Sequence, residues 1–502
     1  MPGEPKAGPA TGSPPALLVL LCLAPAALAL YGIVLMSDDA QWMNRANGSM
    51  PAALGALCLW TAYRMVRSKP VTLWTPVPWF LAAWTVYYGF GALAYVYGTP
   101  ETVAYMDTFY PVDDRALLRT NVLNVVGLLV VISGGVLFSR MRIGLAAKQN
   151  GAGDDPWRVA LLFLCIGVPV KYLLELPYAL GLVDYVLPGS IQFLGTFSGL
   201  AILPLAVAAS AGRRGARSLF WMLVAAEIAV GFVMLAKLHI IKTVLLTFLG
   251  QYAVRANLKR LIVTGLIVAI GYVAVLSPFV NFARTLLGRA SAQSVGETVE
   301  AVQAFGAEGR ETLADVLPGV QGWWARLAYA NAQTFAMDQY DRGEPGWTFA
   351  MVGYVFVPRF LYAGKPIMTP GIDFTYLVQG TDTSSTGPGF FVAEAYWNGG
   401  WPVVILVGLF VGGLFAILGR FTIHAVRSRR WLEAPLIFTT IYLGLRPDDW
   451  FVPAYVGGVL QVIVVVLILR LVFSGLVRRR VRRPKDPKVT PSIGTSVPRT
   501  SP

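Results

Sequence analysis

The sequence predicts an all-α polytopic membrane protein with about twelve transmembrane helices. Of its 502 residues, 56% are hydrophobic and only 14% are charged, and the mean hydropathy is +0.59. Soluble proteins carry about 25% charged residues, so this composition excludes a soluble globular domain. The apolar runs are also close to the length of one membrane crossing, about 20 residues.

Nine apolar stretches precede one long loop that we expect to be exterior, and three follow it. The chain divides into a leader (1–14), membrane helices (15–277), the long loop with interfacial helices (278–401), further membrane helices (402–477) and a basic tail (478–502). The boundary at 236–240 is the least marked. The twelve stretches are 15–36, 50–64, 77–97, 117–138, 157–174, 190–210, 218–236, 240–254, 261–277, 402–419, 433–445 and 452–476.

The net charge of +14 reports membrane orientation rather than a nucleic-acid partner. Lys and Arg gather in every second connection, and the intervening connections are neutral or acidic. Because cytoplasmic loops carry such an excess, we expect both termini in the cytoplasm and the first stretch retained rather than cleaved. The basic groups surround Arg64, Arg140, Arg213, Arg255 and Arg427, and fill the tail.

The second half of the long loop carries polar residues that an ordinary membrane span excludes. One aromatic block, VGYVFVPRFLYAGKP, contains Arg359 and Lys365. The next, GFFVAEAYWNGGWP, contains Glu394, Tyr396 and Asn398 at a spacing of two. Such a segment is typical of a loop that lies against a bilayer and holds anionic groups there.

The middle of the loop reads GWWARLAYANAQ and places Arg326 and Asn331 among Trp and Tyr residues. Sugars present both CH faces and hydroxyls, so aromatic rings beside hydrogen-bonding groups suit a sugar site. Anchoring at the membrane interface would explain the same aromatics. The last exterior connection, LGLRPDDWFVP, adds Arg446 on the side of the long loop.

Other ionisable residues lie at the exterior ends of predicted spans. Lys171 and Glu175 are spaced for a local salt bridge. The pattern favours a packing role for Glu227, whereas Lys237 and Lys242 fit either a lipid phosphate or a cation reaching the interface. Neither the two histidines nor the three cysteines show metal-ligand spacing, so we predict no metal and no cofactor.

Three segments together carry a resemblance to a known family. They are R-x-x-Y-A-N (Arg326 to Asn331), V-P-R-F…G-K-P (Val357 to Pro366) and G-x-F-x-A-E-A-Y-W-N-G-G-W (Gly389 to Trp401). With about twelve spans and one late exterior loop, the chain resembles the Wzy-type oligosaccharide repeat-unit polymerases, also called O-antigen or exopolysaccharide polymerases. Unlike the related ligases, it has no loop histidine.

This resemblance implies a GT-C-like glycosyltransferase architecture in a bacterial cytoplasmic membrane. The substrate would be an undecaprenyl-pyrophosphate-linked oligosaccharide, joined outside the membrane without a metal. Membrane lipid, a chain-length regulator and a flippase are the partners that it implies. The negative charge of the leaving pyrophosphate must then be stabilised by fixed cations, and guanidinium groups are suited to this role.

The candidate site follows from this chemistry. The phosphate-binding candidates are Arg284, Arg326, Arg359 and Arg446, with Lys365 as a weaker one. Glu394 has the most apolar surroundings of the loop carboxylates and is the expected proton acceptor, with Asp373 in reserve. Asn331, Tyr396 and Asn398 are expected to contact sugar.

Other functions are open at this point. Asp38 and Asp39 follow the first span and fit a metal-dependent transferase that uses polyprenyl-monophosphate sugars. A polysaccharide or lipid transporter (flippase) would instead show mid-membrane charges, broken helices and internal repeats. A non-catalytic assembly factor also fits. The sequence does not indicate the sugars, the linkage stereochemistry, the chain-length control or the oligomeric state.

Overall fold

The computed structural model describes residues 15–141, 153–180, 182–183, 189–287, 295–307, 319–357, 362, 364–366, 368–381 and 385–477. The regular secondary structure in these ranges is helical. Nine of the described helices are long and apolar enough to cross a membrane, and Trp431–Leu445 is a shorter apolar helix. The prediction of an all-α polytopic membrane protein is therefore confirmed.

Each of the twelve predicted stretches contains helix, although α2, α12 and α22 are not among the nine. Several stretches combine α, 3₁₀ and π segments. The elements are α1 (Pro15–Ser37), α2 (Ala40–Ser68), α3–η2–α4 (Pro76–Trp84, Thr85–Phe90, Ala94–Tyr97), α6 (Asp114–Ser139), α7–η3–α8 (Pro156–Val168, Pro169–Glu175, Leu176–Ala179), α9 (Gly189–Leu200), α10 (Ile202–Ser210), α11 (Ala216–Val233), α12 (Lys237–Val254), α13–η4–α14 (Leu258–Gly271, Tyr272–Leu276, Ser277–Leu287), α21 (Phe391–Arg427), η6–α22 (Trp431–Glu433, Ala434–Leu445) and η7–α23 (Phe451–Gly458, Val459–Val477).

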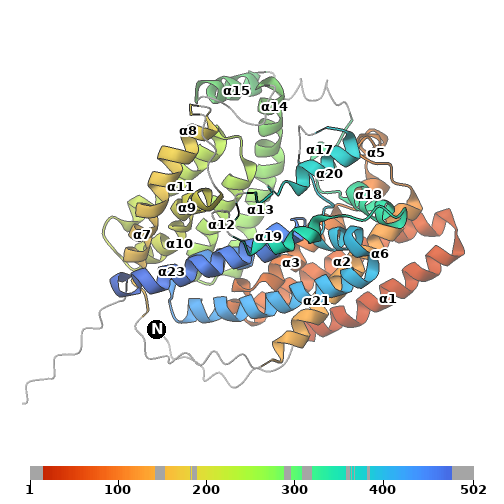
Figure 1. Ribbon diagram of the computed structural model, residues 1–502, viewed down its shortest axis with the longest axis horizontal. Helices are drawn as coiled ribbons and strands as arrows, with labels where there is room; N and C mark the ends of the chain where they lie inside the picture. Colours follow the sequence, from red (N-terminus) through yellow and green to blue (C-terminus); the bar gives the residue numbers. More distant parts are fainter. Residues whose placement is uncertain are drawn as a thin grey trace, which may run out of the picture.

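Short helices of the long loop gather at one end of the bundle, together with the connection before α6. In Figure 1, the short helices α5, α17, α18 and α20 lie together at the upper right of the molecule. Asn331 Nδ2 donates to Met106 O at 3.1 Å, and Tyr88 OH donates to Gly389 O at 2.5 Å. We call this the loop end. Its elements are α5 (Pro100–Asp107), α15 (Val295–Ala307), α17 (Gly322–Ala325), α18 (Ala330–Asp341), η5 (Thr348–Met351), α19 (Val352–Val355) and α20 (Pro370–Gln379).

Connections predicted to be cytoplasmic contact one another at the other end. Tyr252 OH donates to Pro70 O at 3.2 Å. Arg420 Nη1 donates to Met141 O at 2.5 Å. These contacts join connections that are far apart in the sequence but basic in composition. We call this the basic end, which includes the η1 turn (Pro70–Trp74).

Helix α21 begins earlier than the sequence suggested. The expected start was near Pro402, but the helix starts at Phe391, after Phe390 in an extended conformation. Gly399 (φ −174°) and Gly400 (φ +67°) interrupt it, and the second of these conformations favours glycine. The last part of the predicted loop is therefore a helical entry to the span, which places residues four apart, rather than two apart, on one face.

Small residues let α21 lie directly against α6. A Cβ at Gly412 would overlap with the carbonyl of Val131, and one at Gly134 would overlap with the carbonyl of Leu409. Close approach through glycine is a common way of packing transmembrane helices, because it increases van der Waals contact. The α6–α21 pair therefore provides a firm base for the loop-end elements that follow it.

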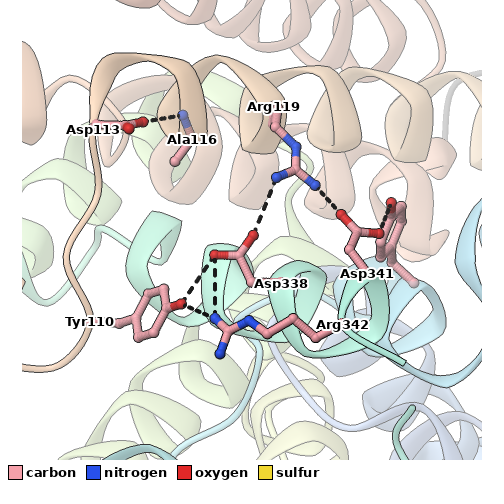
Figure 2. A network of polar contacts seen from close by, with 8 residues as sticks. Tyr110, Asp113, Ala116, Arg119, Asp338, Asp341 and Arg342 are labelled. Carbon is pink, nitrogen blue, oxygen red and sulfur yellow. Dashed lines mark hydrogen bonds and ion pairs between the residues drawn. The ribbon is translucent and has the colours of Figure 1, made fainter. Parts of the chain in front are cut away.

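An ion-pair network fastens α18 across α6 and α21 (Figure 2). Arg119 on α6 donates to Asp338 at 3.2 Å and also pairs with Asp341. Tyr396 OH on α21 donates to Asp341 Oδ1 at 2.9 Å, and Tyr110 OH donates to Asp338 Oδ2 at 3.1 Å. We call this network the α18 clasp, and it fixes the loop helix that follows the R-x-x-Y-A-N segment.

Candidate functional site

A cavity of about 430 Å³ lies among six elements of the bundle. Its lining comes from these six, η3, α9, α11, α12, α22 and η7, and also from the start of α23. This volume falls within the range of small-ligand sites, about 300–1,000 Å³. Its ionisable lining residues are Lys171, Glu175, Glu227, His239, Lys242 and Asp449.

Three of these side chains form a buried cluster. Lys171 Nζ lies 2.5 Å from Glu227 Oε2, and His239 Nε2 lies 2.9 Å from the same oxygen. Ser198 Oγ donates to Glu227 Oε1 at 2.7 Å. The side chains of Lys171 and Glu227 are 6% and 0% exposed, so the ion pair neutralises charges that water does not reach.

The Nε2 atom of His239 has two alternative hydrogen-bond partners in this cluster. His239 Nε2 also lies 3.0 Å from Lys171 Nζ. If Nε2 carries a proton, it donates to Glu227; if it does not, it accepts from Lys171. Which of the two hydrogen bonds forms therefore depends on the tautomer of the imidazole.

Local backbone geometry brings the cluster together. Lys171 belongs to a π-helical segment, and such segments occur often at functional sites. Leu235 takes a left-handed conformation (φ 48°) in the turn between α11 and α12, which locates the boundary expected near 236–240. Because α12 starts directly afterwards, His239 and Lys242 lie in its first two turns.

A second group of cations surrounds Tyr442. Lys242 Nζ lies 4.9 Å from the centre of its ring, and the Arg446 guanidinium lies 5.8 Å from it. Arg446 is paired with Asp448 at 2.8 Å, and it also donates to Tyr442 OH at 3.2 Å. Among the described residues, Lys242 has no carboxylate in ion-pair distance, so its ammonium group is available to an anion in the cavity.

Asp449 brings a carboxylate to the same place. It lies in the turn between α22 and η7, and it lines the cavity. Burial raises the pKa of the Asp449 carboxyl above its ordinary value, while the charge of Arg446 opposes that rise. Burial likewise raises the pKa of the Tyr329 phenol well above its ordinary value.

The turn at residues 446–450 separates the cavity from the loop segments that carried the family resemblance. Tyr329 OH donates to Asp448 Oδ2 at 3.3 Å. Phe391 N donates to Pro447 O at 3.0 Å. Gly389 (φ +74°) allows the chain to pass Tyr329, with whose side chain a Cβ would overlap. The two predicted segments around Tyr329 and Gly389 therefore meet at the turn that carries Arg446.

Glu394 forms hydrogen bonds to two elements beside this turn. Its side chain is in the protein interior, with 1% of the residue exposed. Thr348 Oγ1 donates to Glu394 Oε1 and Phe451 N donates to Oε2, both at 2.6 Å. Both carboxylate oxygens are thus engaged, and they connect α21 to η5 and to the start of η7.

The other residues expected to contact sugar also bond within the protein. Asn398 Nδ2 donates to Thr348 Oγ1 and to Glu394 O, each at 2.9 Å. Asn331 bonds to the α5 backbone, and Tyr396 belongs to the α18 clasp. These side chains connect loop-end elements to one another rather than lining the cavity.

The remaining predicted site residues lie apart from the cavity. Asp373 is in the first turn of α20, with Thr369 Oγ1 at 3.5 Å. Lys365 Nζ donates to Val357 O at 3.0 Å, and Arg326 is exposed at the end of α17. Arg359 and the side chain of Arg284 lie outside the described part of the chain. Of the predicted cations, Arg446 is thus the one described beside the cavity.

The buried cluster brings together residues that the sequence analysis considered separately. Glu227 was expected to have a packing role and Lys171 to form a local pair with Glu175, and the two were not linked to each other. Their common signal is that each is ionisable and lies near the loop end of an apolar helix. Lys237 is held by α14, because its Nζ donates to Asn281 Oδ1 at 2.7 Å.

No group of three or more His, Cys, Asp or Glu side chains in the described ranges has a metal-binding arrangement. Asp39 caps α2, where its Oδ1 accepts from Gln41 N at 2.8 Å, and Asp38 lies 3.5 Å from Arg115. Comparisons of the chain with protein-family models, curated proteins and solved structures give no match.

Proposed function

We propose that this protein is a membrane glycosyltransferase that polymerises undecaprenyl-pyrophosphate-linked oligosaccharide repeat units. In this proposal it lies in the bacterial cytoplasmic membrane with both termini in the cytoplasm. The loop end then faces outward and the basic end inward, because cytoplasmic connections carry the excess of Lys and Arg. No metal and no cofactor take part, and a flippase supplies the substrate.

One observation carries the proposal: Lys242 and Asp449 line one cavity directly beside Arg446. A glycosyl transfer from a lipid pyrophosphate needs fixed positive charge for the leaving group and a base for the incoming hydroxyl. Lys242 and Arg446 supply the first and Asp449 the second. The resemblance of the adjoining loop segments to polymerases supports the same chemistry.

The reaction then proceeds by one displacement. The acceptor hydroxyl oxygen bonds to C1 of the donor sugar while the bond from C1 to the pyrophosphate oxygen breaks. Asp449 takes the hydroxyl proton, and undecaprenyl pyrophosphate leaves as an anion beside Lys242 and Arg446. The aromatic ring of Tyr442 lies against both cations and interacts favourably with their charge.

Glu394 has a positioning role in this proposal. Its Oε2 accepts from Phe451 N, two residues beyond Asp449. It therefore fixes the turn that carries both Asp449 and Arg446. Both of its oxygens accept hydrogen bonds of 2.6 Å from within the protein, which suits a positioning role.

A transporter is the second candidate function. The buried cluster of Lys171, Glu227 and His239 is the kind of ionisable group that marks ion and proton pathways in membranes. Two of the helices that line the cavity also begin or end in π-helical segments. In this alternative the cluster would couple substrate movement to protonation.

Deletion of the gene separates the two functions. We expect the surface glycan of the deletion strain to run on a gel as single repeat units without a ladder. Loss of a flippase would instead remove exported units altogether, and that result would contradict the proposal. Plasmid-borne parent protein should restore the ladder.

Substitutions of two residues that line the cavity test their proposed roles. Asp449→Asn and Lys242→Met are expected to abolish or strongly reduce the ladder while the protein still inserts and purifies normally. Glu344→Gln is the matched control, because Glu344 is an exposed carboxylate at the loop end. A full ladder from a well-folded Asp449→Asn protein would remove Asp449 from the reaction.

A further inference from the structure

A second pocket, of about 600 Å³, lies at the basic end. It is formed where α10 and α12 end and where α11 and α13 begin. Three arginines line it, namely Arg217, Arg255 and Arg260. The pocket is distinct from the cavity described above, since the two share no lining residue.

The three guanidinium groups have no acidic partner in the described part of the chain. Arg217 belongs to the first turn of α11, Arg255 follows the last residue of α12, and Arg260 belongs to the first turn of α13. No carboxylate lines the pocket with them. Three unpaired guanidinium groups in one hollow form a site for an anion with several oxygens, such as a phosphate.

The same pocket has an apolar side. Trp221, Phe248 and Leu261 line it beside the arginines. Helix α13, which forms one wall, has no buried residue, and Ile262 and Leu266 are 49% and 60% exposed. In a chain that crosses a membrane, such a helix borders lipid. An occupant of the pocket therefore meets charge at one end and hydrocarbon at the other.

We infer that this pocket binds the phosphate headgroup of an anionic phospholipid, whose acyl chains lie along α13. Basic pockets between transmembrane helices bind anionic lipid headgroups in this way. A soluble phosphate would use the arginines but leave the apolar wall without a role. This site does not depend on the proposed polymerase activity.

Native mass spectrometry of the purified full-length protein tests the inference. Phosphatidylglycerol and cardiolipin are expected to bind in preference to zwitterionic phosphatidylethanolamine. In the triple variant Arg217→Gln, Arg255→Gln, Arg260→Gln, binding of the anionic lipids should weaken roughly 100-fold, because each juxtamembrane cation contributes about fivefold. Millimolar inorganic phosphate should not displace the lipid.

Arg64→Gln, Arg67→Gln, Lys69→Gln is the matched control. It removes the same charge at the basic end from residues that do not line the pocket. Each of the single variants Arg217→Gln and Arg260→Gln should also weaken binding, which keeps the test decisive if the triple variant does not fold. Equal binding by parent and single variants, equal loss in the control, or displacement by phosphate would overturn the inference.

Discussion

Replacement of Glu394 by glutamine separates a positioning role from a catalytic one. In the parent, both oxygens of the side chain accept hydrogen bonds, from Thr348 Oγ1 and from Phe451 N. Glutamine offers one oxygen and one NH₂ group. If its oxygen faces Phe451 N, its NH₂ replaces the oxygen to which the Thr348 hydroxyl donates; in the reverse orientation, its NH₂ faces the Phe451 N–H.

Either orientation of the glutamine leaves one buried donor without an acceptor. Such a group costs about 1–3 kcal/mol, so Glu394→Gln should lower the free energy of unfolding by that amount. Thermal unfolding of the purified protein in detergent measures this loss. Glu344→Gln, at an exposed position, should unfold like the parent.

The activity of the same variant completes the test. A positioning role predicts reduced polymerisation that recovers in part at low temperature, with an unchanged pH profile. The reasoning would be refuted by a Glu394→Gln protein that unfolds at the parent temperature, binds lipid-linked substrate and makes no polymer. That result would assign proton transfer to Glu394 itself.

Four further outcomes are expected. Gly389→Ala should cost about 1–2 kcal/mol for the left-handed backbone alone, and should displace Tyr329 and reduce polymerisation measured on glycan gels. Arg119→Gln opens the partly exposed α18 clasp, and should cost only about 1 kcal/mol in thermal unfolding. Because burial raises the pKa of Asp449 and a base acts when deprotonated, polymerisation should increase with pH through a midpoint above the ordinary value of about 4. A reporter fused at residue 340 should be exterior and one fused after Arg217 cytoplasmic, and a cytoplasmic signal from 340 would contradict the proposed site.

The helical membrane architecture could be predicted from the sequence because it depends on one-dimensional properties. Apolar length identifies spans, and every predicted stretch contains helix in the structure. The start of α21 was missed because Phe391 to Asn398 combines aromatic and polar residues. Those polar groups bond to η5 and η7 rather than to water, and such long-range partners are not visible in a local pattern.

The candidate site was predictable only in part. Tyr329 and Gly389 lie in contact beside the turn that carries Arg446. Single sequence positions gave no reason to connect Lys171, Glu227 and His239, which come from three helices. Which ionisable groups meet depends on helix rotation and on π-helical segments, and neither follows from hydropathy.

The most direct test of the proposed function is polymerisation by the purified protein. A synthetic undecaprenyl-pyrophosphate-linked repeat unit is supplied in proteoliposomes with EDTA, and products are separated by length. The proposal predicts oligomers of two or more repeat units, release of undecaprenyl pyrophosphate, and loss of both in Asp449→Asn. Unchanged repeat units that have crossed the bilayer would contradict it and identify a transporter.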